Sequence, residues 1–185
     1  LPGPVGDLVP DHRPHALHGL HVLLVDDDAH IRSVVGRELM GDPRVLLVGQ
    51  ASSYREARKG ILAEEFDVLL VDLSLSEGQG ADLLELVQLR MPNVLSIAIS
   101  SSEKDDTAID AFKKGVVGYF LKNSWFGSYS QAVLEVANGG ASISPTVAKK
   151  ILPKIFKYSA PEEGPLDHKK LEKLTDREKE VLRLI

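Results

Sequence analysis

Five short apolar runs, separated by longer amphipathic segments, constrain the fold of this chain more than any other feature. Most of the runs are continuously apolar, which is typical of parallel strands covered on both faces. The predicted strands are residues 21–26, 45–50, 66–72, 94–100 and 116–122. The segments between and after them have apolar residues at helical spacing. They predict helices at 29–40, 53–64, 79–90, 103–114 and 127–138.

This alternation predicts one doubly wound α/β domain over residues 20–140, with right-handed crossovers between parallel strands. In such sheets, ligands bind beyond the carboxyl ends of the strands, near the point where the strand order reverses. The residues that follow the predicted strands are therefore the first candidates for a functional site.

Composition excludes several classes of protein. The 185 residues have a formal net charge of -5, which gives no overall electrostatic case for nucleic-acid binding by these residues. The absence of cysteine excludes disulfides, thiolate metal sites and cysteine nucleophiles. No apolar run approaches the roughly 18–20 residues that span a bilayer, and the N-terminus lacks the features of a secretory signal. We expect a cytoplasmic protein without a membrane partner.

Polar side chains follow four of the five predicted strands. Asp26 and Asp27 lie at the end of the first, Asp72 ends the third, Ser100 ends the fourth and Lys122 ends the fifth. Clustered carboxylates disfavour ionisation unless a cation relieves their repulsion. Oxygen ligands without nearby histidine or cysteine suit Mg²⁺, which readily shares its coordination with phosphate oxygens. This pattern predicts a Mg²⁺ and phosphoryl site with no other cofactor.

The same residues can be assigned chemical roles. The Asp72 carboxylate can attack phosphorus to form an acyl phosphate. Lys122 can neutralise phosphoryl oxygens, and Ser100 can donate a hydrogen bond to them. Asp28 directly follows the acidic pair, and we expect it to cap the next helix or to lie in its first turn.

Four spaced motifs, "VDDDAH", "VDLSLSEGQG", "AISSSE" and "GYFLKN", resemble those of the receiver domain of two-component response regulators. The resemblance implies a flavodoxin-like (βα)5 sheet with strand order 2-1-3-4-5. It also implies that Asp72 is the phosphoacceptor and that Asp26 and Asp27 belong to the Mg²⁺ pocket. The backbone carbonyl of Ser74 would be a further ligand of the metal.

The resemblance also assigns a switch. Ser100 would be its hydroxyl, and Tyr119, three residues before Lys122, would be its aromatic residue. The chain departs from the common family pattern at Ser76, where many members have proline, so a more mobile loop is expected there. It departs again at Asn123, which also replaces a common proline.

The C-terminal residues resemble a subfamily. Residues 141–173 are predicted to be a linker with a short helix beginning near Pro145. Residues 174–185 include Thr175 and Glu178 at capping-box spacing, and they resemble the opening helix of LuxR-type (NarL/FixJ) regulators. By that resemblance, the rest of a DNA-binding helix-turn-helix domain lies beyond the sequence. Residues 1–19 are predicted to be a flexible leader.

The implied function is a switch controlled by phosphorylation. A sensor histidine kinase would phosphorylate Asp72, which would change dimerisation or release the DNA-binding domain and so control transcription. The protein would not be an enzyme beyond self-phosphorylation from small donors and autodephosphorylation. Two alternatives stay open: an aspartyl-nucleophile phosphatase using the D-x-D pattern of Asp26 and Asp28, and a phosphorylation-independent interaction module. The sequence assigns no role to Trp125 beyond packing or a dimer face.

Overall fold

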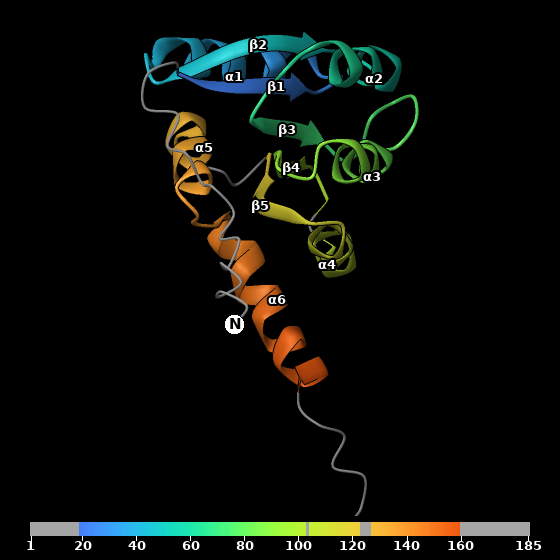
Figure 1. Ribbon diagram of the computed structural model, residues 1–185. Coiled ribbons are helices and arrows are strands. Elements are labelled where there is room, and N and C mark those ends of the chain that lie inside the picture. Colours follow the sequence, from blue (N-terminus) through green and yellow to red (C-terminus); the bar gives the residue numbers. More distant parts are fainter. Residues whose placement is uncertain (1–18, 103, 123–126, 160–185) are drawn as a thin grey trace, which may run out of the picture. The chain divides into compact units, whose positions relative to one another are not determined.

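A parallel six-stranded sheet organises the chain (Figure 1). The computed structural model describes residues 19–102, 104–122 and 127–159. The strands are β1 (Leu20–Val25), β2 (Val45–Ala51), β3 (Val68–Asp72), β4 (Leu95–Ser100), β5 (Val116–Leu121) and β6 (Ser142–Ile143). The helices are α1 (Ala29–Gly41), α2 (Tyr54–Ala63), α3 (Gly80–Arg90), α4 (Asp105–Lys113), α5 (Tyr129–Ala137) and α6 (Pro145–Ser159).

The predicted strands and helices are all present, with ends that agree to within a residue or two. The strand order is β2-β1-β3-β4-β5-β6. The predicted order 2-1-3-4-5 is therefore correct for five strands, and the structure adds β6 beside β5. Residues 1–18 of the predicted leader, Trp125, and the predicted segments 160–173 and 174–185 lie outside the described residues.

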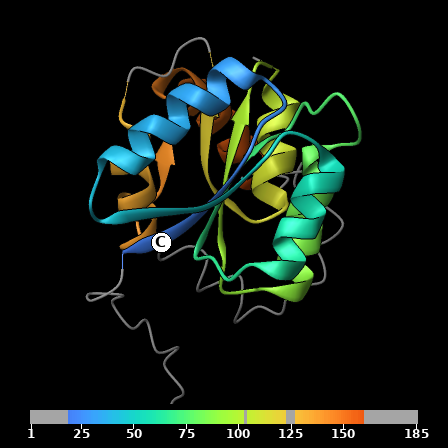
Figure 2. The same ribbon diagram turned by 90° about the horizontal axis from the view of Figure 1, so that it is seen from above.

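Alternate side chains of each central strand enter different apolar layers, which explains why the strands are continuously apolar. On β1, for example, Leu23 and Val25 pack in one cluster, whereas Val22 and Leu24 pack in the other. The first layer is covered by α2, α3, α4 and the beginning of α6. The second is covered by α1 and α5, so helices lie on both faces of the sheet (Figure 2). A strand in this environment has no face that must be polar.

The β6 strand was not predicted, because two residues provide no recognisable apolar run. It pairs with Gly118 and Tyr119 of β5. A Cβ atom at Gly118 would lie 2.8 Å from the backbone oxygen of Ser142. Only glycine therefore allows β6 to approach β5 this closely without a shift of the backbone.

Ser144 joins β6 to α6 and is fully buried. Its backbone N–H donates to the Tyr119 carbonyl over 2.9 Å, and its hydroxyl accepts from the Leu121 N–H over 3.1 Å. The first of two compact units runs to Ile151. It extends past the predicted boundary at residue 140, so residues 141–151 pack with the sheet. In the part of the chain that the structure describes, no helix has the length and apolarity required to cross a bilayer.

Candidate functional site

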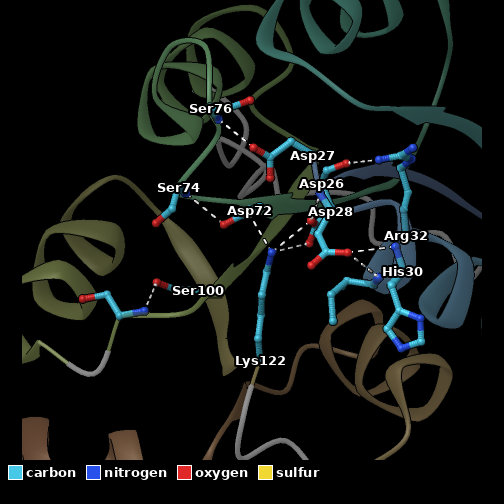
Figure 3. A network of polar contacts seen from close by, with 12 residues as sticks. Asp26, Asp27, Asp28, His30, Arg32, Asp72, Ser74, Ser76, Ser100 and Lys122 are labelled. Atoms are coloured by element: carbon cyan, nitrogen blue, oxygen red, sulfur yellow. Dashed lines mark hydrogen bonds and ion pairs between the residues drawn. The ribbon is translucent and has the colours of Figure 1, made fainter.

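Lys122 bridges two buried carboxylates at the carboxyl ends of β1, β3 and β5 (Figure 3). Its Nζ atom donates to Asp72 Oδ2 over 2.8 Å and to Asp26 Oδ1 over 2.9 Å. The side chain of Lys122 is only 8% exposed, and those of Asp26 and Asp72 are 0% and 2% exposed. The parallel sheet therefore unites residues that are up to 96 positions apart in the sequence.

The site has more negative than positive charge. Carboxylate oxygens of Asp26, Asp27 and Asp72 lie within 4.8 Å of one another, and Lys122 contacts two of these three acids. Asp26 Oδ2 lies 2.9 Å from Lys122 Nζ, but it makes no hydrogen bond of adequate geometry with the described residues. A cluster of oxygen ligands with surplus negative charge and an unsatisfied buried oxygen fits a second cation, and Mg²⁺ suits such ligands.

Burial and charge act in opposite directions on the ionisable groups. Burial raises the pKa of Asp26, although the hydrogen bonds from Lys122 and the Asp28 backbone act to lower it. Burial alone would lower the pKa of Lys122, but the hydrogen bonds and charges of Asp72 and Asp26 outweigh it and raise that pKa. Lys122 is therefore shifted toward its charged form, whereas burial shifts Asp26 toward its neutral form, and further positive charge nearby would oppose that second shift.

The loop after β3 holds Asp72 from its other side. The Ser74 N–H donates to Asp72 Oδ1 over 2.8 Å, so among the described residues each Asp72 oxygen accepts a hydrogen bond. Gly80, the first residue of α3, lies directly against the end of β3. A Cβ atom at this position would lie only 2.0 Å from the Asp72 backbone oxygen, so the close approach requires glycine. Ser74 lies at the site as predicted, and the role of its carbonyl as a metal ligand stays a prediction.

Asp28 has a separate role, as predicted. It is the N-cap of α1, and its Oδ1 accepts from the His30 N–H over 2.8 Å and from the Ile31 N–H over 3.2 Å. The bonds from Ile31 and His30 lower the pKa of Asp28. The three consecutive aspartates therefore divide into two site residues and one helix cap.

Ser100 and Tyr119 form a neighbouring group. Ser100 is fully buried, and its Oγ accepts from the Ser102 N–H over 3.0 Å. Tyr119 is also fully buried, with a long contact of 3.5 Å from its hydroxyl to the Ser102 carbonyl. Burial raises the pKa of Tyr119, and a hydrogen bond with Ser100 opposes that change. Both predicted switch residues therefore lie together, and the Ser100 carbonyl accepts a hydrogen bond from the Lys122 N–H over 2.9 Å.

Two contacts at the site were not predicted. Arg32, in α1, donates from its guanidinium to the Asp26 carbonyl over 2.7 Å. The Ser76 N–H donates to Asp27 Oδ2 over 2.7 Å. Both contacts use a main-chain atom, and residue identity alone does not indicate where a main-chain group will point. The sequence therefore contains no signal for either contact.

The model of the response regulator receiver domain matches residues 22–133. The chain belongs to this family. DevR/DosR, a DNA-binding transcriptional activator of Mycobacterium tuberculosis, is 30% identical over 164 residues, which cover 89% of this chain and 73% of the relative. The transcriptional regulatory protein LiaR of Bacillus subtilis is 28% identical over 166 residues, or 90% of this chain and 76% of the relative.

Solved receiver structures agree with this assignment. The receiver domain of a NarL response regulator from Mycobacterium tuberculosis has a TM-score of 0.61 and 28% identity, and the match covers 66% of this chain and 98% of that domain. A LuxR-family response regulator from Aurantimonas shares the fold, with a TM-score of 0.69, 22% identity, and coverage of 75% and 99%. The receiver fold and the LuxR-type resemblance predicted from the sequence are confirmed.

Proposed function

We propose that Asp72 of this transcription-regulating response regulator accepts a phosphoryl group from a sensor histidine kinase in a Mg²⁺-dependent reaction. The observation that carries the proposal is the Lys122 bridge between Asp72 and Asp26. It holds a carboxylate nucleophile beside a fixed cation, in a buried group of acids that needs further positive charge. Such positioning and charge neutralisation provide most of phosphoryl-transfer catalysis.

The transfer conserves atoms and charge. A carboxylate oxygen of Asp72 forms a bond to phosphorus as the bond between phosphorus and the kinase histidine nitrogen breaks, and the electron pair of that bond returns to the imidazole. Lys122 is in place to exchange part of its contact with Asp72 for a contact with a phosphoryl oxygen. Asp26, Asp27 and Asp72 would hold Mg²⁺, which would neutralise charge on the phosphoryl oxygens.

The conformational change that follows phosphorylation would involve Ser100 and Tyr119. Phosphorylation would replace the single negative charge of the Asp72 carboxylate with an acyl phosphate of charge roughly -2, and the Ser100 hydroxyl would turn toward it, away from the Ser102 N–H. Tyr119 packs in the same apolar cluster as Val147 and Ile151 of α6. A change around Tyr119 would therefore alter the docking of α6, and with it dimerisation or the release of a C-terminal DNA-binding domain.

Incubation with a small phosphodonor and Mg²⁺, followed by Phos-tag electrophoresis and mass spectrometry, tests the proposal. We expect one phosphoryl group on Asp72 and none in D72A or in the presence of EDTA. An unmodified Asp72, or equal labelling of D72A, contradicts the mechanism.

Two further assays address the alternatives. Sustained hydrolysis of small phosphate esters would support a phosphatase instead, although Asp28 of the D-x-D pattern is engaged as a helix cap. Light scattering with beryllofluoride and Mg²⁺ tests the output, and an unchanged particle size would support a phosphorylation-independent module.

A further inference from the structure

The loop between β3 and α3 is tied to the loop between β1 and α1 by one hydrogen bond. The Ser76 main-chain N–H donates to Asp27 Oδ2 over 2.7 Å, across a sequence separation of 49 residues (Figure 3). An N–H bond to an ionised carboxylate is short and stronger than a neutral one. The Ser76 hydroxyl takes no part in this bond.

This contact matters because the three acids are restrained very differently. Asp26 accepts from Lys122 and from the Asp28 N–H, and Asp72 accepts from Lys122 and the Ser74 N–H. Among the contacts of the described residues, the side chain of Asp27 has only the hydrogen bond from Ser76. Asp27 is also half-exposed, so without this bond it would be free to rotate into solvent.

We propose that the Ser76 N–H positions Asp27 for cation binding, so that Ser76 is a positioning residue of the Mg²⁺ site. The bond engages Oδ2 and leaves Oδ1 available to a cation. This proposal rests on the proposed function for the role of Asp27 as a ligand, and it adds a contact made by the main chain of a non-ligand residue.

The residue type at position 76 decides whether the contact exists. Proline has no N–H, so a chain with proline here could not make this bond to Asp27. Serine or alanine can make it equally well. Because binding effects are reciprocal, a cation on Asp27 should also order the loop that contains Ser76.

Calorimetric Mg²⁺ titration of the full chain compares wild type, S76P and S76A. We expect S76P to raise the dissociation constant at least about tenfold, as for loss of one charge-assisted hydrogen bond. S76A keeps the N–H and should stay within about twofold of wild type. Equal or tighter binding by S76P overturns the proposal, and so does an S76A variant as weak as S76P, because the hydroxyl would then be responsible.

Proline also restricts the backbone of the loop, and a double-mutant cycle separates the two effects. In a D27A background, where the acceptor is gone, S76P should change the dissociation constant less than about twofold. A further large loss in that background would show that proline acts through the loop and not through Asp27, which overturns the proposal.

Amide hydrogen exchange by NMR without Mg²⁺ or phosphodonor gives an independent measurement. D27A should accelerate exchange of the Ser76 N–H several-fold and leave the Ser74 N–H, which donates to Asp72, unchanged. Ser76 exchange that is insensitive to D27A overturns the proposal. If wild type binds no Mg²⁺, the metal assignment fails together with this proposal. If wild type and S76P bind equally, only the role of Ser76 fails.

Discussion

Two ion-paired clusters lie at opposite ends of the sheet. At the amino end, Arg44 contacts Asp42 through two hydrogen bonds of 2.9 and 2.7 Å in the turn that precedes β2. At the carboxyl end, Lys122 contacts Asp26 and Asp72 over nearly the same distances. The Arg44 side chain is 61% exposed, however, whereas that of Lys122 is 8% exposed.

The difference in exposure shows that a short distance between the charged atoms does not by itself identify a functional site. Arg44 and Asp42 balance each other, and the Arg44 side chain stays largely in solvent. Their pair closes a turn, and ion pairs near the surface contribute little to stability. In the Lys122 cluster, the ammonium and the two acids that it contacts are buried, and a third, half-exposed acid lies beside them. Under the proposed function, charge that is both buried and unbalanced would favour binding of a further cation and of a phosphoryl group.

Removing the buried cation should have the largest effect. We expect K122M to lower the free energy of unfolding by about 3 kcal/mol without Mg²⁺, because it leaves two buried carboxylates without their partner. Added Mg²⁺ should restore part of that loss. Urea denaturation measures both effects. The matched control is K114M, which removes an exposed pair with Glu85 and should change stability by less than about 1 kcal/mol. Equal losses in the two variants would contradict the contrast between buried and exposed pairs.

The next largest effect concerns the backbone that carries Asp72. In G80A, the new Cβ would lie 2.0 Å from the Asp72 oxygen, so β3 and α3 must separate. We expect a loss of about 2 kcal/mol in unfolding free energy, together with slower phosphorylation. G41A is the control, because a Cβ at Gly41 meets nothing within 4 Å. A G80A variant as stable and as active as G41A would show that the close approach is unimportant.

Reducing the surplus negative charge should stabilise the apo protein. D72N keeps the shape of the side chain and removes one acid, so we expect the free energy of unfolding to rise by about 1 kcal/mol without Mg²⁺. The stabilisation by Mg²⁺ should decrease at the same time. Thermal denaturation with and without Mg²⁺ measures both changes. A destabilised D72N would mean that Lys122 already balances the acids.

The exposed cluster should show the smallest effect on stability but a clear change in titration. The hydrogen bonds from the Arg44 side chain and backbone lower the pKa of Asp42 from 3.8 to about 2. Because this pKa is depressed in the folded state, the pair stabilises the fold above about pH 4, and that contribution is lost as the pH falls toward 2. In R44A, the pKa of Asp42 should move back toward 3.8, as followed by NMR of its side-chain carbon. An unchanged pKa would mean that the backbone bond from residue 44 alone holds the carboxylate.

Much of the site could be predicted because parallel strands place their carboxyl ends at one edge. Asp26, Asp72 and Lys122 were identified from their positions after apolar runs, and the structure brings them into contact. The cap role of Asp28 also followed from local sequence, since a cap acts on the next two or three residues. The donation from Ser76 to Asp27 could not be predicted, because it depends on the path of a loop.

The amino-acid sequence by itself determined the five strand–helix units, the receiver family and the residues at the strand ends. These features depend on local periodicity and on the residue types at the strand ends, which any parallel sheet places along one edge. Only the tertiary structure decided that β6 pairs with β5 and that the start of α6 packs against the sheet. It also decided that Lys122 donates to two buried acids and that the Ser76 N–H donates to Asp27. Each of these depends on how closely distant backbone segments approach, and that distance is set by packing of the whole domain.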